Sequence, residues 1–471
     1  MTMLELLQSN PEKAKDIICQ NRTDKDYTFE TWENEYAGKH KILSDINRQA
    51  KSVGSGQNQR YVYPATLTMT FQKKIVRAAV NFLFGSPVEL VLNNEETEYQ
   101  EPFQKLLDAW KDNRVDAFNK ELMTDVCIYT QAAELWYTTG NVEDKTAPPQ
   151  IGVNLLSYDT SEELYPYFNE FGQMIAMARK FIANEIDDQG TVQKIKTTVI
   201  YTSDTIYTFR DTTGDGAFKQ EVNPFGKIPV IYYEQETTEW NDVQRLIDRL
   251  EMLISRHADT NDYFGSPILE VWGEFVKMPE KEDDGKSIQI AADVNKKTGE
   301  VVKKGGFDFK TWDFAPQSIE LEMKNLKEFI YSLTSTPDLS FNNVKGLSNL
   351  SGIAIKLMFM DAVLKAYDHQ ILYGEMLDRR LKVMQAILGK MNLAQEKLFK
   401  DMSISVKFTS VLPDNIQETI TNLITAAGGD AIMSQETAVK RNPYVDSPET
   451  EIELLDAQRE ASNNMGGTFN I

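Results

Sequence analysis

The stretch TSTPDLSFNNVKGLSNLSGIAIK, Thr334 to Lys356, separates two helical patterns and decides how the second half of the chain is organised. Apolar residues recur every three or four positions over Gln317–Leu333, and again over Gly352–Leu388. That spacing is typical of amphipathic helices. The residues between them are rich in Ser, Asn and Gly, with Asp338 near the start and Lys345 as the only base. The pattern predicts a polar loop between two helices.

A small β module precedes the first of these helices. Trp240–Tyr263 has helical spacing, whereas Phe264–Phe314 contains short apolar runs separated by charged turns. Within it, Asp293–Val302 (DVNKKTGEVV) has the composition of a β-hairpin. The chain is therefore predicted to leave along a helix, form a β module of about fifty residues and return along a helix. Such a projection suits the docking of a partner.

A second β-rich region lies upstream. From Ala132 to Pro229 the apolar period changes to two, and turn signals stand at Gly140-Asn141, Asn169–Gly172, Asp187–Gly190 and Gly214–Gly216. This combination predicts a β-rich domain of roughly ninety residues.

The two ends of the chain are predicted to be mainly helical. The first sixty residues are expected to form short helices with polar joints. From Tyr63 the pattern is helical until Gly85-Ser86-Pro87, a strand follows at Val88–Leu92, and Phe103–Cys127 is helical again. Near the C-terminus we expect a strand and then three helices. Their ranges are Met402–Leu412, Ile416–Ala426, Ser434–Arg441 and Pro448–Ala461.

Composition limits the possible classes of protein. The 471 residues are 41% hydrophobic and 26% charged, which is typical of a folded protein with several domains. No run of 18 apolar residues occurs, so no membrane-spanning helix is expected. With only Cys19 and Cys127, a disulfide framework is not expected. The net charge of −21, from 71 acids and 50 bases, is opposite to that of proteins that grip DNA phosphates.

No motif for catalysis is present in the sequence. The three histidines, His40, His257 and His369, are far apart, and neither GxxxxGK[ST], GxGxxG nor GxSxG occurs. Asp211–Gly216 (DTTGDG) is like a calcium loop only at its start, because Val222 stands where the ligating Glu is needed. We therefore expect no enzyme activity, no cofactor and no metal, and an assembly role is favoured.

Several segments together resemble a known family. They are NFLFGSPVEL (Asn81–Leu90), NPFGKIPVIYYEQ (Asn223–Gln235), LIDRLEMLISRHADTNDYFGSPILEVWG (Leu246–Gly273), the opening stretch, and GGDAIMSQETAVKRNPYVDSPETEIELL (Gly428–Leu455). In this order, over about 400 residues, they resemble portal (head-to-tail connector) proteins of long-tailed double-stranded DNA bacteriophages.

The resemblance implies an α+β portal fold with a β-rich wing, a two-helix stem, a small α/β clip, a long wing helix and a helical crown. The implied domains are residues 1–131 (helical part of the wing), 132–238 (β-rich wing), 239–263 (stem helix), 264–314 (clip), 315–333 (stem helix), 334–351 (tunnel loop), 352–411 (long wing helix and return strand) and 412–471 (crown and tail).

The resemblance also implies a function. The family forms a ring, usually of twelve subunits, at one capsid vertex, through which double-stranded DNA is packaged and ejected. The implied partners are other copies of the chain, double-stranded DNA that passes through the channel without sequence specificity, terminase, head–tail adaptor proteins, and the major capsid and scaffolding proteins, with no membrane. The implied location is the virion, after assembly in the host cytoplasm.

The acidic balance of the chain fits a channel that does not hold DNA tightly. Neutral side chains and one lysine in the tunnel loop would make weak, exchangeable contacts with a passing backbone, and two glycines would let the loop bend. The candidate channel residues of the loop are Ser340, Asn342, Asn343, Lys345, Gly346, Ser348 and Asn349. On the second stem helix the candidates are Glu320, Lys324, Lys327 and Glu328.

Two other interpretations stay open from the residues alone. One is an oligomeric structural scaffold unrelated to phages. The other is a metal-dependent nuclease or phosphotransferase whose acidic ligands are dispersed along the chain.

Overall fold

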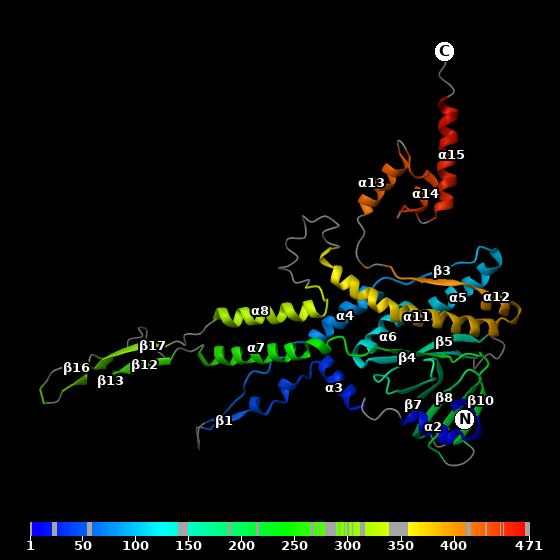
Figure 1. Ribbon diagram of the computed structural model, residues 1–471. Helices are drawn as coiled ribbons and strands as arrows, with labels where there is room; N and C mark the ends of the chain where they lie inside the picture. Colours follow the sequence, from blue (N-terminus) through cyan, green and yellow to red (C-terminus); the bar gives the residue numbers. More distant parts are fainter. Residues whose placement is uncertain are drawn as a thin grey trace.

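The computed structural model (Figure 1) describes most of the chain. The residues outside the description are 1, 21–25, 54–58, 140–148, 187–189, 213–215, 265–267, 273, 278–288, 292, 296, 299–300, 304, 311–315, 339–356, 410, 412–415, 429–430, 443, 446 and 467–471.

The N-terminal part is helical, as predicted, and ends in a hairpin. Helices α1 (Met3–Ser9), α2 (Pro11–Cys19) and α3 (Asp26–Ala37) are followed by the single turns η1 (Lys41–Leu43) and η2 (Ile46–Arg48). Strands β1 (Lys51–Val53) and β2 (Arg60–Val62) then pair antiparallel. This hairpin was not predicted. We call residues 39–70, as far as they are described, the arm.

The helix predicted from Tyr63 starts later than expected. Residues 63–70 form neither helix nor strand, and α4 spans Phe71–Phe84. Pro64 disfavours helix in the residue before it. The amides of Ala65, Leu67 and Met69 are bonded to side chains of another helix, described below, and are therefore not available for a helical turn. The predicted stop at Gly85 is confirmed.

The region predicted as helical over Phe103–Cys127 contains two helices. The turn η4 (Thr97–Tyr99) leads into α5 (Gln100–Asp112), and α6 spans Val115–Tyr129. Arg114 separates them with φ 49°, a left-handed conformation that is unusual without glycine. The sequence has neither Gly nor Pro at this break, so it was not predicted.

The β-rich region divides into two antiparallel sheets. One has the order β10-β9-β8-β7-β6 and the other β11-β4-β5. The strands are β4 (Gln131–Thr139), β5 (Gln150–Leu156), β6 (Glu163–Phe168), β7 (Met174–Ile186), β8 (Val192–Tyr201), β9 (Thr205–Arg210), β10 (Phe218–Val222) and β11 (Val230–Glu234). A third pairing joins β3 (Glu89–Leu92) to β18 (Ile404–Lys407), which are more than 300 residues apart.

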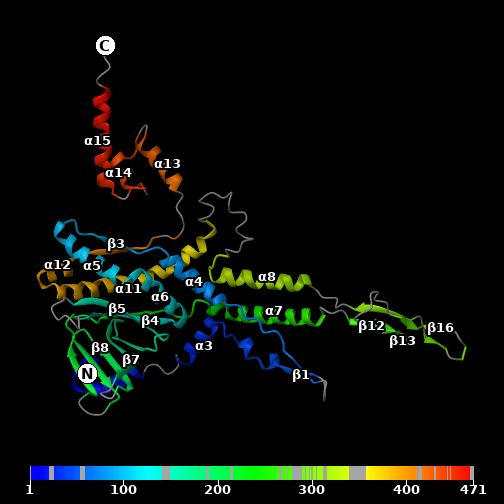
Figure 2. The same ribbon diagram turned by 180° about the vertical axis from the view of Figure 1, so that it is seen from behind.

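Two long helices carry the small β module. After η5 (Asn241–Val243), α7 (Gln244–Phe264) leads out, and α8 (Pro316–Leu333) leads back. Figure 2 shows the two side by side, with the strands beyond their far end. The module contains β12 (Ile268–Trp272), β13 (Glu274–Lys277), β14 (Gln289–Ala291), β15 (Asp293–Val294), β16 (Val301–Lys303) and β17 (Gly306–Lys310). β12 pairs with β17 and β15 with β16, which confirms the predicted hairpin.

The expectation of an α/β module at residues 264–314 is not met in its described part. Apart from the end of α7, its regular elements are strands alone. The sequence there is cut into short apolar runs by charged turns, which leaves no stretch with several helical periods.

The long C-terminal helix and three shorter helices complete the fold. α11 spans Met360–Met391, and the predicted start of this helix, residues 352–356, lies outside the description. After η7 (Leu393–Gln395), α12 (Glu396–Asp401) and β18 come α13 (Ile416–Ala427), α14 (Gln435–Lys440) and α15 (Pro448–Gly466). The last three lie close to the predicted ranges and stand apart from the body in Figure 1.

The main core lies where α4, α6, α11 and α7 meet. Buried Ile75, Val126, Ile247 and Leu381 belong to it, together with fully buried Trp136 of β4. Among the described residues, no helix is both long and apolar enough to cross a membrane.

Candidate functional site

The candidate tunnel loop begins at the end of α8. Its predicted channel residues, Ser340, Asn342, Asn343, Lys345, Gly346, Ser348 and Asn349, lie outside the described residues. The structure describes the first part of the connection, residues 334–338. The contacts of this first part determine where the chain leaves the body of the protein.

The end of α8 is a tight C-terminal cap. Thr336 N donates to Tyr331 O at 2.9 Å and Ser335 N donates to Ser332 O at 3.1 Å, the pair of bonds that defines a Schellman motif. Ser335 has φ 51°, the left-handed conformation that the motif requires. The Thr334 hydroxyl donates to Ile330 O at 2.7 Å. The chain therefore turns off the helix axis in a defined direction.

Lys365 of α11 binds this cap. Its Nζ donates to Thr334 O at 3.0 Å and lies 2.5 Å from Glu239 Oε2. Glu239 stands in the connection between β11 and α7. One lysine thus joins the start of the loop to two elements that are far away in the sequence, and its side chain is mostly buried.

Glu239 is held in its ionised form. His369 Nε2 lies 3.0 Å from Oε1, one turn along α11 from Lys365. Burial favours the neutral carboxyl, but His369 and Lys365 outweigh it and lower the pKa of Glu239 to about 2. The negative charge that Lys365 needs is therefore present at every pH above strong acid.

Asp338 is held by α4. Lys74 Nζ lies 3.5 Å from Asp338 Oδ1 and donates to the Tyr331 hydroxyl at 2.8 Å. The first five residues of the connection are thereby fixed to α4 and α11. The contacts through Lys74, Glu239 and Lys365 were not predicted. One indication of these contacts was present in the sequence: Lys365 and His369 are four residues apart, which places them on the same face of a helix. This spacing does not identify Glu239 as their partner.

The four predicted stem residues are all exposed on α8. These residues are Glu320, Lys324, Lys327 and Glu328. Lys324 and Glu328 form an ion pair of 3.8 Å along the helix. Such exposed pairs stabilise a fold little. This side of α8 thus presents two acids and two bases to solvent.

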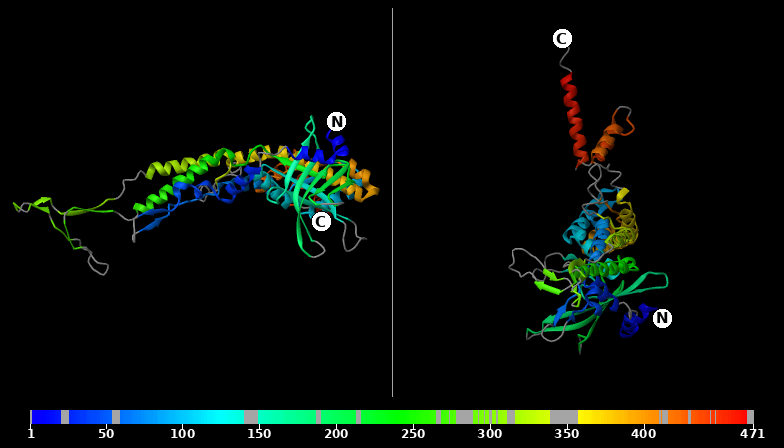
Figure 3. Two further views of the ribbon diagram at one scale, coloured as in Figure 1. Left: turned by 90° about the horizontal axis from the view of Figure 1, so that it is seen from below. Right: turned by 90° about the vertical axis from the view of Figure 1, so that its left-hand side faces the viewer.

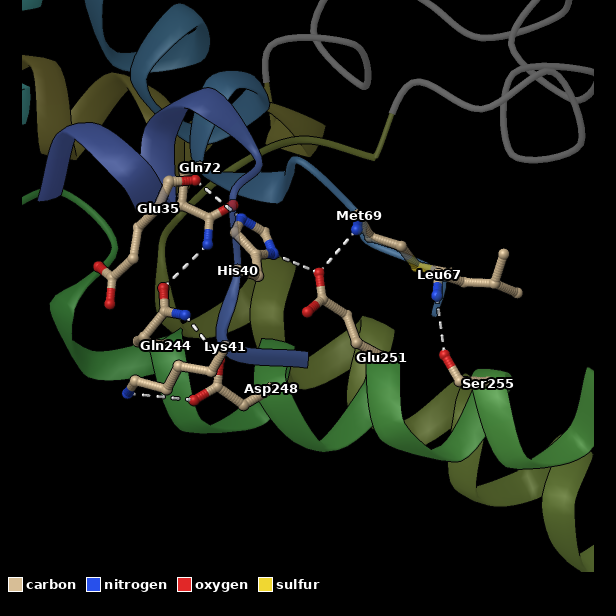
Figure 4. A network of polar contacts seen from close by, with 10 residues as sticks. All are labelled: Glu35, His40, Lys41, Leu67, Met69, Gln72, Gln244, Asp248, Glu251 and Ser255. Atoms are coloured by element: carbon tan, nitrogen blue, oxygen red, sulfur yellow. Dashed lines mark hydrogen bonds and ion pairs between the residues drawn. The ribbon is translucent and has the colours of Figure 1, made fainter. Parts of the chain in front are cut away.

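The arm lies along α7 and is bonded to it at regular intervals (Figure 4). The amide of Met69 donates to Glu251 at 2.6 Å, that of Leu67 to Ser255 at 2.9 Å, and that of Ala65 to Asp259 at 2.6 Å. Alternate residues of an extended chain advance about 6.6 Å, and four residues of a helix about 6 Å, so the two repeats match. We call these three bonds the amide ladder.

His40 closes the ladder at one end. Its Nδ1 contacts Glu251 Oε1, and its Nε2 lies 2.7 Å from Glu35 O. Burial opposes the charged imidazole, but the hydrogen bonds with Glu251 and Glu35 outweigh it and raise the pKa of His40. Arg48 acts at the other end, donating to Ala65 O at 2.6 Å and pairing with Asp259 at 2.5 Å. These contacts were not predicted either.

No candidate metal centre occurs in the part of the chain that the structure describes. There, no three His, Cys, Asp or Glu side chains stand close enough together to hold an ion.

Comparison with known proteins identifies the family. The family model described as "Phage portal protein, SPP1 Gp6-like" matches residues 16–465. The chain therefore belongs to the phage portal proteins of the SPP1 Gp6-like family. It is 22% identical to the portal protein of Bacillus phage SPP1 over 254 residues, which is 52% of this chain and 47% of that protein. The chain thus aligns with about half the length of this relative.

Solved structures of gene transfer agent (GTA) particles are similar at a lower level. One is the neck of the empty particle computed with C6 symmetry, at 10% identity and a TM-score of 0.38, covering 84% of this chain and 96% of that chain. Another is the neck of the native particle computed with C12 symmetry, at 10% identity and a TM-score of 0.38, covering 85% and 98%.

Proposed function

We propose that copies of this chain form a ring at one vertex of a phage capsid, through which DNA enters and leaves. Family membership across residues 16–465 is the observation that carries this proposal. In the ring, twelve copies would surround the channel. Terminase would dock during packaging, and tail adaptors afterwards.

Each part of the chain then has a role. The helices α7 and α8 would be the stem, and the β12–β17 module the clip that meets terminase and adaptors. The two sheets with α11 would be the wing, and α13–α15 the crown. Residues 334–351 would be the tunnel loop, entering the channel from the cap at Ser335. The capsid and scaffolding proteins would contact the outside of the ring, and the location would be the virion.

The fixed start of the loop supports this assignment. A segment that touches moving DNA needs a rigid base, and Lys365 and Lys74 supply it. Beyond the base, Ser340, Asn342, Asn343, Ser348 and Asn349 would form neutral contacts, Gly346 would allow bending, and Lys345 would supply one phosphate contact per subunit.

The charges fit a channel through which DNA slides. A wall of bases would hold each phosphate by counterion release, and the cost would multiply over many contacts. The exposed side of α8 instead carries equal numbers of acids and bases: Glu320, Lys324, Lys327 and Glu328. Charges beyond roughly 8 Å are screened, so these nearby groups matter more than the total of −21.

Electron microscopy and native mass spectrometry of the purified chain test the proposal. We expect rings with a central hole and a mass close to a multiple of 53.7 kDa, with twelve as the expected number. A chain that stays monomeric at high concentration, or that forms open fibres, would contradict the portal ring. Cleavage of DNA that depends on magnesium would support the nuclease interpretation instead.

A further inference from the structure

One side of α11 carries a narrow apolar stripe that the described fold leaves uncovered. Met360, Leu364, Tyr367 and Ile371 are spaced by four, three and four residues, and each is between 43% and 77% exposed. A narrow apolar row with this spacing is the surface through which a helix packs against another helix. Soluble monomers seldom expose such continuous apolar surface.

The stripe is not the side on which α11 packs into its own subunit. That side contains buried Ala362, Ala366 and Tyr373, with the Tyr373 ring 5.4 Å from the ring of Phe84 on α4. At 100° per residue, the stripe points away from these residues. Its cover must therefore come from outside the described part of this subunit.

Helix α8 also carries exposed apolar side chains. Leu321, Phe329 and Leu333 are each more than half exposed. Figure 3 shows α8 and α11 along the same long side of the molecule, with the arm and α4 along the opposite side. The contacts agree, because α8 pairs with α7 through Glu322 and Arg249, whereas the arm is bonded to the other side of α7 through the amide ladder.

The arm, on the opposite side, carries exposed apolar side chains as well. On the arm, Ile46, Tyr61, Tyr63 and Leu67 are between 42% and 85% exposed. A chain with two different apolar surfaces on opposite sides is suited to head-to-tail contact with its own copies.

The exposed charges beside the stripe on α11 and those on α4 are complementary. Beside the stripe on α11 stand Asp361, Asp368 and Glu375, in the flanking position of each heptad, although Glu375 also pairs with Arg379 at 2.6 Å. On the opposite side, α4 presents exposed Lys73 and Arg77. Opposite signs steer the two sides together, whereas each side would repel its own copy.

We infer that the α8–α11 side of one copy packs against the arm–α4 side of the next copy, and that this single contact repeats around the ring. The inference rests on the proposed ring and adds the two surfaces that close it. The contact is heterologous, so each copy uses both sides once.

Two variants separate the sides. Leu364→Glu with Tyr367→Glu disables the α11 side, and Ile46→Glu with Tyr63→Glu disables the arm side. All four side chains are exposed, so circular dichroism and thermal melting should match the wild type. Phe171→Glu, at a 79% exposed site between β6 and β7, is the matched control and should assemble normally.

The heterologous contact makes a specific prediction for a mixture. Each double variant alone should be monomeric by native mass spectrometry. When mixed, each still offers one intact side, so the two should form 1:1 dimers that do not grow. Rings formed by either variant alone, or a mixture that stays monomeric, would overturn the inference while leaving the portal ring in place. A wild-type chain that forms no ring would overturn the proposed function itself.

Discussion

Arg380 of α11 and Glu134 of β4 form a fully buried ion pair, with Nη2 2.7 Å from Oε2 and Nε donating to Oε1 at 2.9 Å. Arg380 Nη1 also donates to Asn119 Oδ1 at 2.6 Å, and the Tyr233 hydroxyl donates to Glu134 at 3.1 Å. The guanidinium thus joins α11, α6 and both neighbouring strands β4 and β11. A buried charge is tolerated only when it is paired and hydrogen-bonded in this way.

Arg380→Met should destabilise the fold by about 3–5 kcal/mol, because Glu134 would remain buried without its counter-charge. Urea unfolding measures the change. Arg379→Met is the control on the same helix; its exposed pair with Glu375 should contribute less than about 1 kcal/mol. Adding Glu134→Gln to Arg380→Met should recover part of the loss. Equal stability of Arg380→Met and wild type would refute the electrostatic role of the pair.

Glu239 should make the free energy of unfolding depend on pH in the acidic range. Its pKa of about 2 is below the ordinary 4.5, so the stabilisation is present above 4.5 and is lost as the pH falls through 2. The difference corresponds to roughly 3 kcal/mol. The gap in unfolding free energy between wild type and Glu239→Gln should therefore shrink as the pH falls from 6 toward 2. A gap that does not change with pH would show that Glu239 is not held ionised.

Lys365→Met should loosen the start of the connection between α8 and α11 as well as destabilise the fold, because Thr334 O and Glu239 both lose their cation. Hydrogen exchange of the amides of residues 334–336 and 338 should become faster. Lys382→Met, on an exposed part of the same helix, provides the matched control. Unchanged exchange in the Lys365 variant would mean that the Schellman cap alone fixes the loop.

His40 should make the arm sensitive to pH near neutrality. Its pKa is raised from 6.5 in the folded state, so its stabilisation is complete below 6.5 and is lost as the pH rises through the folded-state value. After correction for the intrinsic rate, exchange of the Met69 amide should accelerate on that rise. His40→Gln should remove the pH dependence, whereas His257→Gln on α7 should keep it. An identical profile in both variants would refute the prediction.

A substitution of Lys345 tests the proposed channel through which DNA slides. Lys345→Glu replaces an attraction to phosphate by a repulsion of about 1 kcal/mol per contact. We expect intact rings and reduced DNA packaging, with Lys345→Gln intermediate. Rings of the Glu variant that package DNA as well as wild type would show that Lys345 makes no phosphate contact.

Local patterns predicted the helices, the hairpin and several boundaries. The hairpin at residues 293–303 and the helices at 416–427 and 448–466 form from neighbouring residues, so their signals are present in the sequence itself. The stop at Gly85 is equally local. The family resemblance then assigned these elements to the domains of a portal fold.

Contacts between distant residues could not be predicted. Residues 63–70 have a helical pattern but are not helical, because α7, about 190 residues away, accepts hydrogen bonds from their amides. The division into two sheets depends on β11 pairing with β4 and not with β10. Lys365 and Glu239, 126 residues apart, give no sign of one another in the sequence. The predicted channel residues of the loop remain predictions.

The amide ladder also has a mechanical consequence. Its three hydrogen bonds lie in a row along α7. A pulling force on the β12–β17 module, directed along the axis of α7, would act on all three hydrogen bonds at once. The bonds would then not break one after another. Geometry of that sort resists shear better than peeling. Tension applied at the far end of this module would thus be transmitted to the arm as a unit.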